Sequence, residues 1–314
     1  MYLEADRGVK KSAGITARLG EGLGAMLRLF PAGAPMWIYT RVLHRWPLRA
    51  LTHFLLMRLI PERIIMPEGT LLLNKKDAVV SGALTLGVYE RGSLARWREL
   101  VKDGMTVVDV GANIGIYTLI AARRNPNGRV IAIEPNAENA DVLERMIKVN
   151  SLRNVTVLRV AAGATRGQGM LHLDQHNKGQ HSLVAFQEAV GSETVSVHRI
   201  DDVMSEMGVH RVDLVKMDIE GFEAKAFAGM SGLLDTGHPT LLFEFMPEWI
   251  RRAGDDPCEL LMSLEKRGYH LSTLNEDDGS AEPLTDIVRF LTRFQKPNDY
   301  VNMLALHRES SYNA

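Results

Sequence analysis

The chain has 314 residues, which is long for one ordinary domain and short for two large ones. Hydrophobic residues make up 46% of it and charged residues 24%, as in a soluble globular protein that buries a core. The net charge of −1 excludes a global attraction to nucleic acid, and the single cysteine, Cys258, excludes an internal disulfide. We therefore predict a protein of a reducing, cytoplasmic compartment with no nucleic-acid partner.

Residues 1–62 are predicted to form a basic, helical N-terminal cap. The start has acidic residues and no apolar core, so it does not predict a secretory signal. Leucines recur at helical spacing over 48–59, but Arg49, His53 and Arg58 interrupt this stretch, so it cannot span a bilayer. Two interpretations stay open: helices packed on the main domain or on a partner subunit of a homo-oligomer, and an amphipathic surface for peripheral contact with an anionic membrane.

From about residue 105, short β-branched runs alternate with helical patterns. Strands are predicted at 105–110, 128–134, 154–160, 213–219, 240–245 and 300–307, and helices at 114–124 and 137–150. The alternation predicts an α/β fold with a doubly wound, mostly parallel, Rossmann-like sheet for a domain of residues 63–314. The carboxyl ends of its strands then meet at one edge, where ligands bind.

A longer insertion, 163–211, separates the third and fourth of these strands. It holds two alternating segments, 169–174 and 193–200, which are predicted to pair as an antiparallel extension around the polar loop 175–184. We expect this loop to fold over the site, with His181 or Ser182 facing inward. Asp201 and Asp202 are expected to cap a helix that begins near Val203.

The strongest motif is DVGANIG at 109–115, which follows a buried strand and opens a helix. Gly111 and Gly115 fit a backbone that turns sharply and lets a ligand approach. Glu134 ends the next strand, where an acidic residue holds the ribose of a bound nucleoside. Asn113 and Ile116 stand where a nicotinamide dinucleotide site has glycines, so a nucleoside without a pyrophosphate fits better.

S-adenosyl-L-methionine meets these requirements. Its carboxylate suits the backbone N–H groups at a helix start, and its cationic groups suit the acidic residue Asp109. The alternative for Asp109 is a cap on the helix that follows it.

At this point the chain resembles the FkbM-type methyltransferases. The resemblance extends from GVYE (87–90) to LLFEF (241–245) and includes VVDVGANIGIYT, the stretch from GRVIAIEPN onward, and VDLVKMDIEGFEAKAFAGM. It implies S-adenosyl-L-methionine as methyl donor and a hydroxyl group of a sugar or secondary metabolite as acceptor. The sequence departs from the family pattern at GQHSL, where His181 replaces a small residue.

The resemblance also suggests a set of donor-binding residues. Gly111, Asn113 and Gly115 would shape the methionine pocket, Glu134 would bind the ribose hydroxyls, and Glu90 would join them. Asn136 would contact the ribose or adenine, or else cap the helix that begins at Ala137. Ala161 and Ala162 would admit the adenine ring, or else only provide tight packing. The full predicted donor site is Glu90, Asp109, Gly111, Asn113, Gly115, Glu134, Asn136, Ala162 and Asp218.

KMDIEG (216–221) is the candidate for chemistry. Lys216, Asp218 and Glu220 alternate, so on a strand they would share one face. Asp218 is predicted near the donor's sulfonium and Glu220 near the acceptor, as the base that takes its proton, while the alternative is an ion pair with a helix cap. His181 and Glu244 are further candidates for the base. A divalent metal between Asp218 and Glu244 is conceivable, but no compact ligand cluster argues for it, so we predict none.

The sequence therefore predicts an S-adenosylmethionine-dependent O-methyltransferase. The alternatives are an NAD(P)-dependent sugar oxidoreductase, against which the missing glycines count, and a non-catalytic binding protein on the same fold. The intact carboxylates Asp109, Glu134, Asp218 and Glu220 count against the second alternative.

Overall fold

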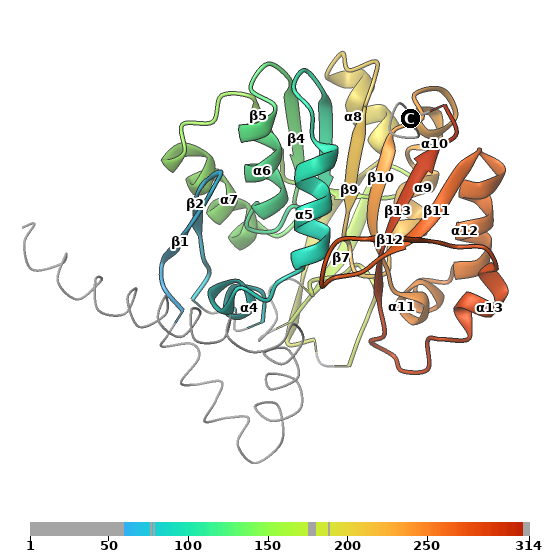
Figure 1. Cartoon of the computed structure of the whole chain (residues 1–314). Helices are drawn as coiled ribbons and strands as arrows, with labels where there is room; N and C mark the ends of the chain where they lie inside the picture. Colours follow the sequence, from blue (N-terminus) through green and yellow to red (C-terminus); the bar gives the residue numbers. More distant parts are fainter. Residues whose placement is uncertain (1–59, 76, 78, 175–179, 188, 310–314) are drawn as a thin grey trace, which may run out of the picture.

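The computed structural model describes residues 60–309, except for 76, 78, 175–179 and 188 (Figure 1). The predicted N-terminal cap, apart from its last three residues, therefore lies outside the described part, as does half of the loop 175–184. The first described elements are a hairpin of two short strands, β1 (Arg63–Met66) and β2 (Gly69–Leu72).

An eight-stranded sheet forms the centre of the molecule, with the order β12-β11-β13-β10-β9-β3-β4-β5. Strands β3, β4, β5, β9 and β10 run parallel to one another, and β13 is antiparallel to both its neighbours. This confirms the predicted α/β fold with a mostly parallel, doubly wound, Rossmann-like sheet. The strand bounds are β3 (Thr106–Val110), β4 (Arg129–Ile133), β5 (Val155–Leu158), β9 (Leu214–Met217), β10 (Thr240–Phe245), β11 (Tyr269–Leu274), β12 (Ala281–Pro283) and β13 (Val301–His307).

Helices cover both faces of the sheet because its central strands are apolar on both sides. On one face, α5 (Arg91–Leu100), α6 (Ile116–Arg124) and α7 (Ala137–Val149) pack over residues such as Val107 and Leu242. On the other face, α8 (Ile200–Glu206), α9 (Glu223–Ala228), α10 (Ser231–Thr236) and α12 (Pro257–Lys266) pack over Val108 and Phe243. The remaining helices are α4 (Val80–Leu86), α11 (Pro247–Arg252) and α13 (Ile287–Leu291).

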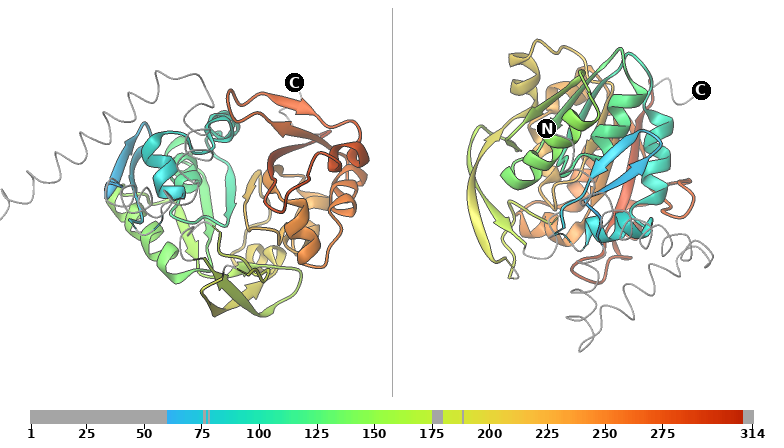
Figure 2. Two further views of the ribbon diagram at one scale, coloured as in Figure 1. Left: turned by 90° about the horizontal axis from the view of Figure 1, so that it is seen from below. Right: turned by 90° about the vertical axis from the view of Figure 1, so that its left-hand side faces the viewer.

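The insertion folds as its own three-stranded sheet, with the order β6-β8-β7. The predicted antiparallel pair is confirmed: β7 (Gly167–Leu173) pairs with β8 (Gly191–His198), from Gly167 opposite Val197 to Leu173 opposite Gly191. The short β6 (Ala161–Ala162) joins β8 in parallel. Seen from below, this small sheet lies beside the carboxyl edge of the large one, facing α4 and the C-terminal strands (Figure 2).

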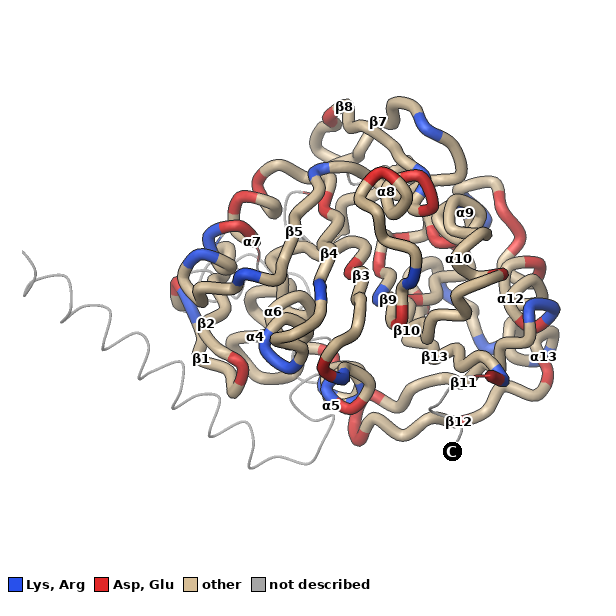
Figure 3. The backbone as a smooth tube through the Cα atoms, turned by 90° about the horizontal axis from the view of Figure 1, so that it is seen from above, with Lys and Arg blue, Asp and Glu red and all other residues tan. Residues whose placement is uncertain are grey.

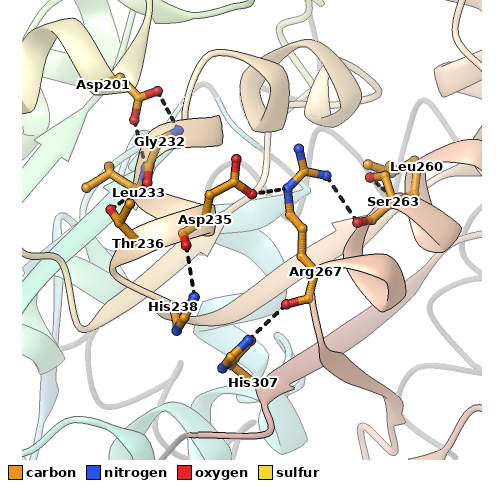
Figure 4. Close-up of polar contacts among 10 residues, drawn as sticks. All are labelled: Asp201, Gly232, Leu233, Asp235, Thr236, His238, Leu260, Ser263, Arg267 and His307. Atoms are coloured by element: carbon orange, nitrogen blue, oxygen red, sulfur yellow. Dashed lines mark hydrogen bonds and ion pairs between the residues drawn. The ribbon is translucent and has the colours of Figure 1, made fainter.

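At the opposite, amino edge of the large sheet, polar contacts tie α10 to α8 and to α12 (Figure 4). The Asp201 carboxylate accepts hydrogen bonds from the backbone N–H groups of Gly232 and Leu233 at 2.9 and 3.1 Å. Asp201 therefore caps α10, a helix 30 residues further along, rather than a helix beginning near Val203, and α8 already begins at Ile200. The expectation was wrong because side-chain capping across elements leaves no local sequence signal.

The backbone coloured by charge shows acidic and basic residues interspersed around the periphery (Figure 3). This distribution agrees with the net charge near zero. Among the described residues, no helix is both long and apolar enough to cross a membrane.

Candidate functional site

A cavity of about 360 Å³ opens at the carboxyl edge of the sheet. Its wall combines the ends of β3, β4, β9 and β10 with α4, the start of α5 and the insertion. This volume lies within the range of roughly 300–1,000 Å³ that is usual for small-molecule sites. The predicted site residues that line it are Glu90, Asp109, Gly111, Asn113, Glu134, Ala161, Ala162, His181, Asp218, Glu220 and Glu244.

The glycine turn brings the chain close to its neighbours. Gly111 has φ +79°, and a Cβ atom there would lie 1.8 Å from the backbone oxygen of Asp218, so only glycine fits between the ends of β3 and β9. Gly115, with φ +92°, caps α6, and a Cβ atom there would press into Leu143 of α7. Gly111 thus shapes the cavity, whereas Gly115 lies outside its wall and serves helix packing.

Glu134 lies at the end of β4 with its carboxylate anchored by backbone donors. Oε2 accepts a hydrogen bond from the N–H of Asn113 at 2.8 Å, and Oε1 accepts one from the N–H of Asn136 at 2.9 Å. Burial raises the pKa of Glu134 to about 7, although these two hydrogen bonds oppose the shift. The side chain is therefore held rigidly at the cavity wall, where it can accept hydrogen bonds from a ligand.

Asn136 lies at the start of α7 and does not line the cavity. The Asn136 side chain accepts a hydrogen bond from the N–H of Asn139 at 3.0 Å and donates one to Glu193 of β8 at 2.9 Å. It therefore caps α7 and ties this helix to the insertion, which was the alternative left open above. Asn139, one turn into α7, lines the cavity in its place.

Asp109 and Lys216 are close to each other because β3 and β9 are adjacent and these two residues are paired in register. The Asp109 carboxylate accepts a 2.6 Å hydrogen bond from the Thr118 hydroxyl, which ties β3 to α6. Burial raises the pKa of Asp109 to about 6, while the Thr118 hydrogen bond and the Lys216 charge act in the opposite direction. Asp109 thus contacts the helix that follows it through a side-chain hydroxyl, while Gly115 is the N-cap of that helix, and Asp109 also lines the cavity.

Lys216 is 1% exposed and carries the cationic charge of the site. Its Nζ lies 3.5 Å from Oδ2 of Asp218 and 4.9 Å from the centre of the Tyr117 ring. Burial opposes its charged form, but Asp218, Glu90 and Glu244 outweigh burial and raise its pKa. Lys216 is therefore a permanent ammonium group under the centre of the cavity.

Three carboxylates converge beside Lys216: one oxygen from each of Glu90, Asp218 and Glu244 lies within 4.8 Å of the other two. Glu90 caps α5 in a left-handed conformation, and its carboxylate accepts a 2.5 Å hydrogen bond from the Tyr117 hydroxyl. Burial raises the pKa of Glu90 to about 7, with Lys216 opposing this shift. The expectation that no compact cluster of ligands exists was incorrect, because the third carboxylate comes from more than 100 residues upstream.

Glu220 follows β9 rather than extending it, since the strand ends at Met217. Its backbone is left-handed, with φ +54°, and the next residue, Gly221, has φ +95°. The Asp218 N–H still donates to the backbone oxygen of Val110 at 2.9 Å, so the pairing with β3 continues to Asp218, which lines the cavity together with Lys216. Glu220 instead reaches the cavity through a turn. Burial, and then the charge of Asp218, raise the pKa of Glu220 well above its usual range.

The insertion contributes Gln180 and His181 to the cavity wall, while Ser182 points elsewhere. The Nδ1 atom of His181 accepts a hydrogen bond from the N–H of Asp174 at 3.1 Å. A neutral ring in this arrangement has its proton on Nε2 and acts as a donor, so the geometry does not favour His181 as the base. The Ser182 hydroxyl instead donates a 2.7 Å hydrogen bond to the backbone oxygen of Glu220.

Comparison with known proteins decides the family. The sequence model of the methyltransferase FkbM domain matches residues 109–271, more than half of the chain, and this stretch contains most of the cavity wall. The chain belongs to the FkbM methyltransferase family.

Individual relatives are distant. Methyltransferase sdnD of Sordaria araneosa is 29% identical over 196 residues, which cover 53% of this chain and 74% of that protein. Hexuronic acid methyltransferase AglP of Haloferax volcanii is 26% identical over 175 residues, covering 54% of this chain and 66% of that protein. The crystal structure of methyltransferase FkbM from Methylobacillus flagellatus is 17% identical, with a TM-score of 0.42, and covers 83% of this chain and 60% of that one.

This FkbM methyltransferase also has cavity residues that the sequence reasoning did not select. Tyr89, Tyr117, Asn298 and Tyr300 all line the wall. Tyr89 and Tyr117 stand beside motifs already noted, but a buried tyrosine in such a place is equally typical of a core residue. Asn298 and Tyr300 precede the last strand. They lie far along the chain from the other site residues, so no motif links them to the cavity.

Proposed function

We propose that this protein transfers the methyl group of S-adenosyl-L-methionine to a hydroxyl oxygen of a sugar or secondary metabolite. The observation that carries the proposal is the layout of a single cavity. Glu134, which would hold the ribose, lines it after β4, Asp218 and Glu220 line it after β9, and Glu244 lines it from β10. A nucleoside-binding end joined to an acidic reaction end suits a cationic nucleoside donor and a hydroxyl acceptor.

The donor fits specific features of the cavity. The Glu134 carboxylate is held by two backbone N–H groups and has capacity to accept the ribose hydroxyls. The Asn113 side-chain oxygen is buried with no hydrogen-bond partner, as expected of a group that a ligand completes. Ala161 and Ala162 offer a small apolar surface for the adenine ring, and Asp109 and Asp218 offer negative charge to the methionine cations.

When bound, S-adenosyl-L-methionine supplies an electrophilic methyl group. The protein has two further tasks, which are to align the acceptor and to remove its proton. We assign the proton to Glu220, whose carboxylate lines the cavity and whose raised pKa makes it a stronger base than a free glutamate. Asp218, which is paired with Lys216, would lie near the donor.

Two observations support the proposed class of acceptor: the family of the chain and the polar side chains of the cavity wall. One relative is named a hexuronic acid methyltransferase, which supports a sugar as one candidate acceptor. Gln180, Asn298 and Tyr300 at the cavity wall can exchange hydrogen bonds with hydroxyl groups. We further infer that residues 63–314 form the catalytic domain, with the insertion 163–211 over the site.

The rival functions predict different ligands. An oxidoreductase would bind NAD(P), but Asn113 and Ile116 stand where a dinucleotide site has glycines. A non-catalytic binding protein would have no use for cavity carboxylates such as those of Glu220 and Glu244, which form no ion pair with the described residues.

Calorimetric titration with S-adenosylmethionine, S-adenosylhomocysteine and NAD tests the proposal directly. We expect both adenosyl compounds to bind and NAD not to bind. Incubation with donor labelled in its methyl group and a fractionated metabolite extract would then identify the acceptor from the labelled product. Binding of NAD alone would overturn the proposal, and donor binding without any labelled product would favour the non-catalytic alternative.

A further inference from the structure

The cluster of Glu90, Asp218 and Glu244 has a geometry that the methyl transfer itself does not require. One oxygen from each side chain lies within 4.8 Å of the other two, and all three residues line the cavity. Ligands on opposite sides of Mg²⁺ lie about 4.2 Å apart, and those of Ca²⁺ about 4.6–5.2 Å apart. The three oxygens thus lie close enough to one another to be shared by one hard divalent cation.

Glu244 supplies a second, independent observation. Its residue is 7% exposed and lines the cavity from β10, yet Oε2 is buried and has no hydrogen-bond partner among the described residues. A buried carboxylate oxygen without a donor is costly unless a ligand completes it. Because the neighbouring groups are also carboxylates, the ligand that fits Oε2 is a cation.

The other two carboxylates are held in place from behind. Glu90 accepts hydrogen bonds from the Tyr117 hydroxyl at 2.5 Å and from Asn302 at 3.5 Å, and Asn302 also donates to Glu276 at 3.0 Å. Asp218 is paired with Lys216 at 3.5 Å through Oδ2. In metal sites, hydrogen bonds and ion pairs of this kind hold the coordinating side chains in position. The cluster is therefore organised before a cation binds.

The described cavity wall has more negative charge than the donor alone would neutralise, so it can accommodate a further cation. The wall carries six carboxylates, those of Glu90, Asp109, Glu134, Asp218, Glu220 and Glu244, against the one ammonium group of Lys216. With all six carboxylates ionised, the formal balance is −5. S-adenosylmethionine has two positive groups and one negative group, and therefore brings it only to −4. A divalent cation would bring it to −2.

We propose that Glu90, Asp218 and Glu244 bind a hard divalent cation of the Mg²⁺, Mn²⁺ and Ca²⁺ class, which holds the acceptor's hydroxyl oxygen. The site rests on the geometry alone, while its role rests on the function proposed above. In that role the cation makes the hydroxyl more acidic. The carbon–sulfur bond of the donor breaks, the carbon–oxygen bond forms, the hydroxyl proton passes to Glu220, and S-adenosylhomocysteine leaves.

Titration with Mn²⁺ tests the site without any turnover. Calorimetry and the loss of the free Mn²⁺ electron paramagnetic signal should show one ion per full-length chain. Glu244→Gln keeps the size of the side chain and should weaken binding at least tenfold, which is roughly the least that loss of a metal-site contact costs. Glu220→Gln changes another carboxylate of the same cavity that lies outside the cluster, and should bind Mn²⁺ within about threefold of the wild type.

Three results would overturn the metal site: no Mn²⁺ binding by the wild type, equal binding by Glu244→Gln, or equal loss in both variants. Repeating the titration with saturating S-adenosylhomocysteine distinguishes the cation from the donor's own ammonium group. Binding of both together supports a separate metal site, whereas competition assigns the cluster to the donor. The donor's affinity is measured separately in the same samples, so loss of the metal site would leave the proposed methyl transfer standing.

Discussion

The Ser182 hydroxyl donates a 2.7 Å hydrogen bond to the backbone oxygen of Glu220 and accepts one from the N–H of Val184 at 3.0 Å. Ser182 is 1% exposed, and its backbone forms a pair of hydrogen bonds with His172 of β7. The small sheet of the insertion is thereby attached to the turn that carries the proposed base. Glu220 has left-handed backbone angles, which a residue other than glycine adopts only when its surroundings hold it there.

Ser182→Ala should therefore lower kcat with little effect on donor binding. The substitution removes one buried hydrogen bond, worth about 1 kcal/mol, and leaves a buried backbone oxygen without its donor. We expect kcat to fall roughly fivefold to tenfold and the donor's dissociation constant to change less than twofold. Ser182→Thr retains the hydroxyl and should recover part of the rate. Steady-state kinetics and calorimetry on the same preparations measure both.

Ser263 provides a matched control, because its hydroxyl donates a similar 2.7 Å hydrogen bond to the backbone oxygen of Leu260 in α12 (Figure 4). Ser263→Ala should lower the stability without changing kcat. If the two serine variants lose the same fraction of activity, Ser182 contributes only to stability and does not position Glu220.

Glu220→Gln tests the base itself. Glutamine keeps the size of the side chain but cannot take the acceptor's proton, so donor binding should stay near normal while turnover falls by roughly 10²-fold or more. Because the pKa of Glu220 is raised, the wild-type rate should increase with pH as the carboxyl group ionises, and this dependence should disappear in the variant. Glu282→Gln, on the exposed strand β12, is the control. If Glu220→Gln methylates at the wild-type rate, Glu220 is not the base, and Glu244 becomes the next candidate.

The sequence predicted the sheet and the donor end of the cavity well, because both depend on local patterns. Apolar runs define β3, β4 and β10 within one or two residues, and DVGANIG marks the turn after β3 by residues that backbone geometry requires there. The role of Glu134 was predicted from its spacing to that turn. Each of these features lies within a single strand and the turn after it.

The acceptor end was harder to predict, since its residues meet only through the fold. Glu90 joins Asp218 and Glu244 across the N-terminus of α5, and Tyr300 reaches the wall from the segment before the last strand. Of the two residues predicted to face inward, His181 lines the cavity and Ser182 does not, and the sequence could not separate them because a hydroxyl that binds a backbone oxygen 38 residues away looks the same in sequence as one that faces a ligand.

Donor binding should depend on pH through Glu134. Its pKa is about 7 in the free protein, and only the ionised carboxylate can accept hydrogen bonds from both ribose hydroxyls. Affinity for S-adenosylhomocysteine should therefore increase as the pH rises from 6 to 8. Glu134→Gln should weaken binding by about 1–3 kcal/mol at pH 8, the scale of a charge-assisted hydrogen bond, and should flatten the pH dependence.

Glu144→Gln, on the outer side of α7, is the control for Glu134 because its carboxylate pairs with Arg159 at the surface. It should keep both the affinity and the pH dependence. If Glu134→Gln retains wild-type affinity at pH 8, Glu134 does not contact the ribose.

The last prediction concerns stability and Glu223, a fully buried carboxyl group in the first turn of α9. Its Oε1 accepts hydrogen bonds from the N–H groups of Ile219 and Gly221, both at 3.2 Å, while Oε2 has no hydrogen-bond partner. Burial raises its pKa from 4.5 to about 7, although these hydrogen bonds oppose the shift. Between pH 4.5 and about pH 7, Glu223 therefore keeps its proton in the folded state but has lost it in the unfolded state.

The sign follows from proton linkage. The stability due to protonated Glu223 is fully present below about pH 4.5 and is lost as the pH rises through about 7, at up to about 1.4 kcal/mol per pH unit. Glu223→Gln is neutral at every pH and keeps an oxygen for the Ile219 and Gly221 N–H groups. The free energy of unfolding of the wild type should thus fall relative to that of Glu223→Gln between pH 5 and pH 8. Urea unfolding at pH 5, 6.5 and 8 measures the difference, and a difference that is constant with pH would show that Glu223 keeps its charge in the folded protein.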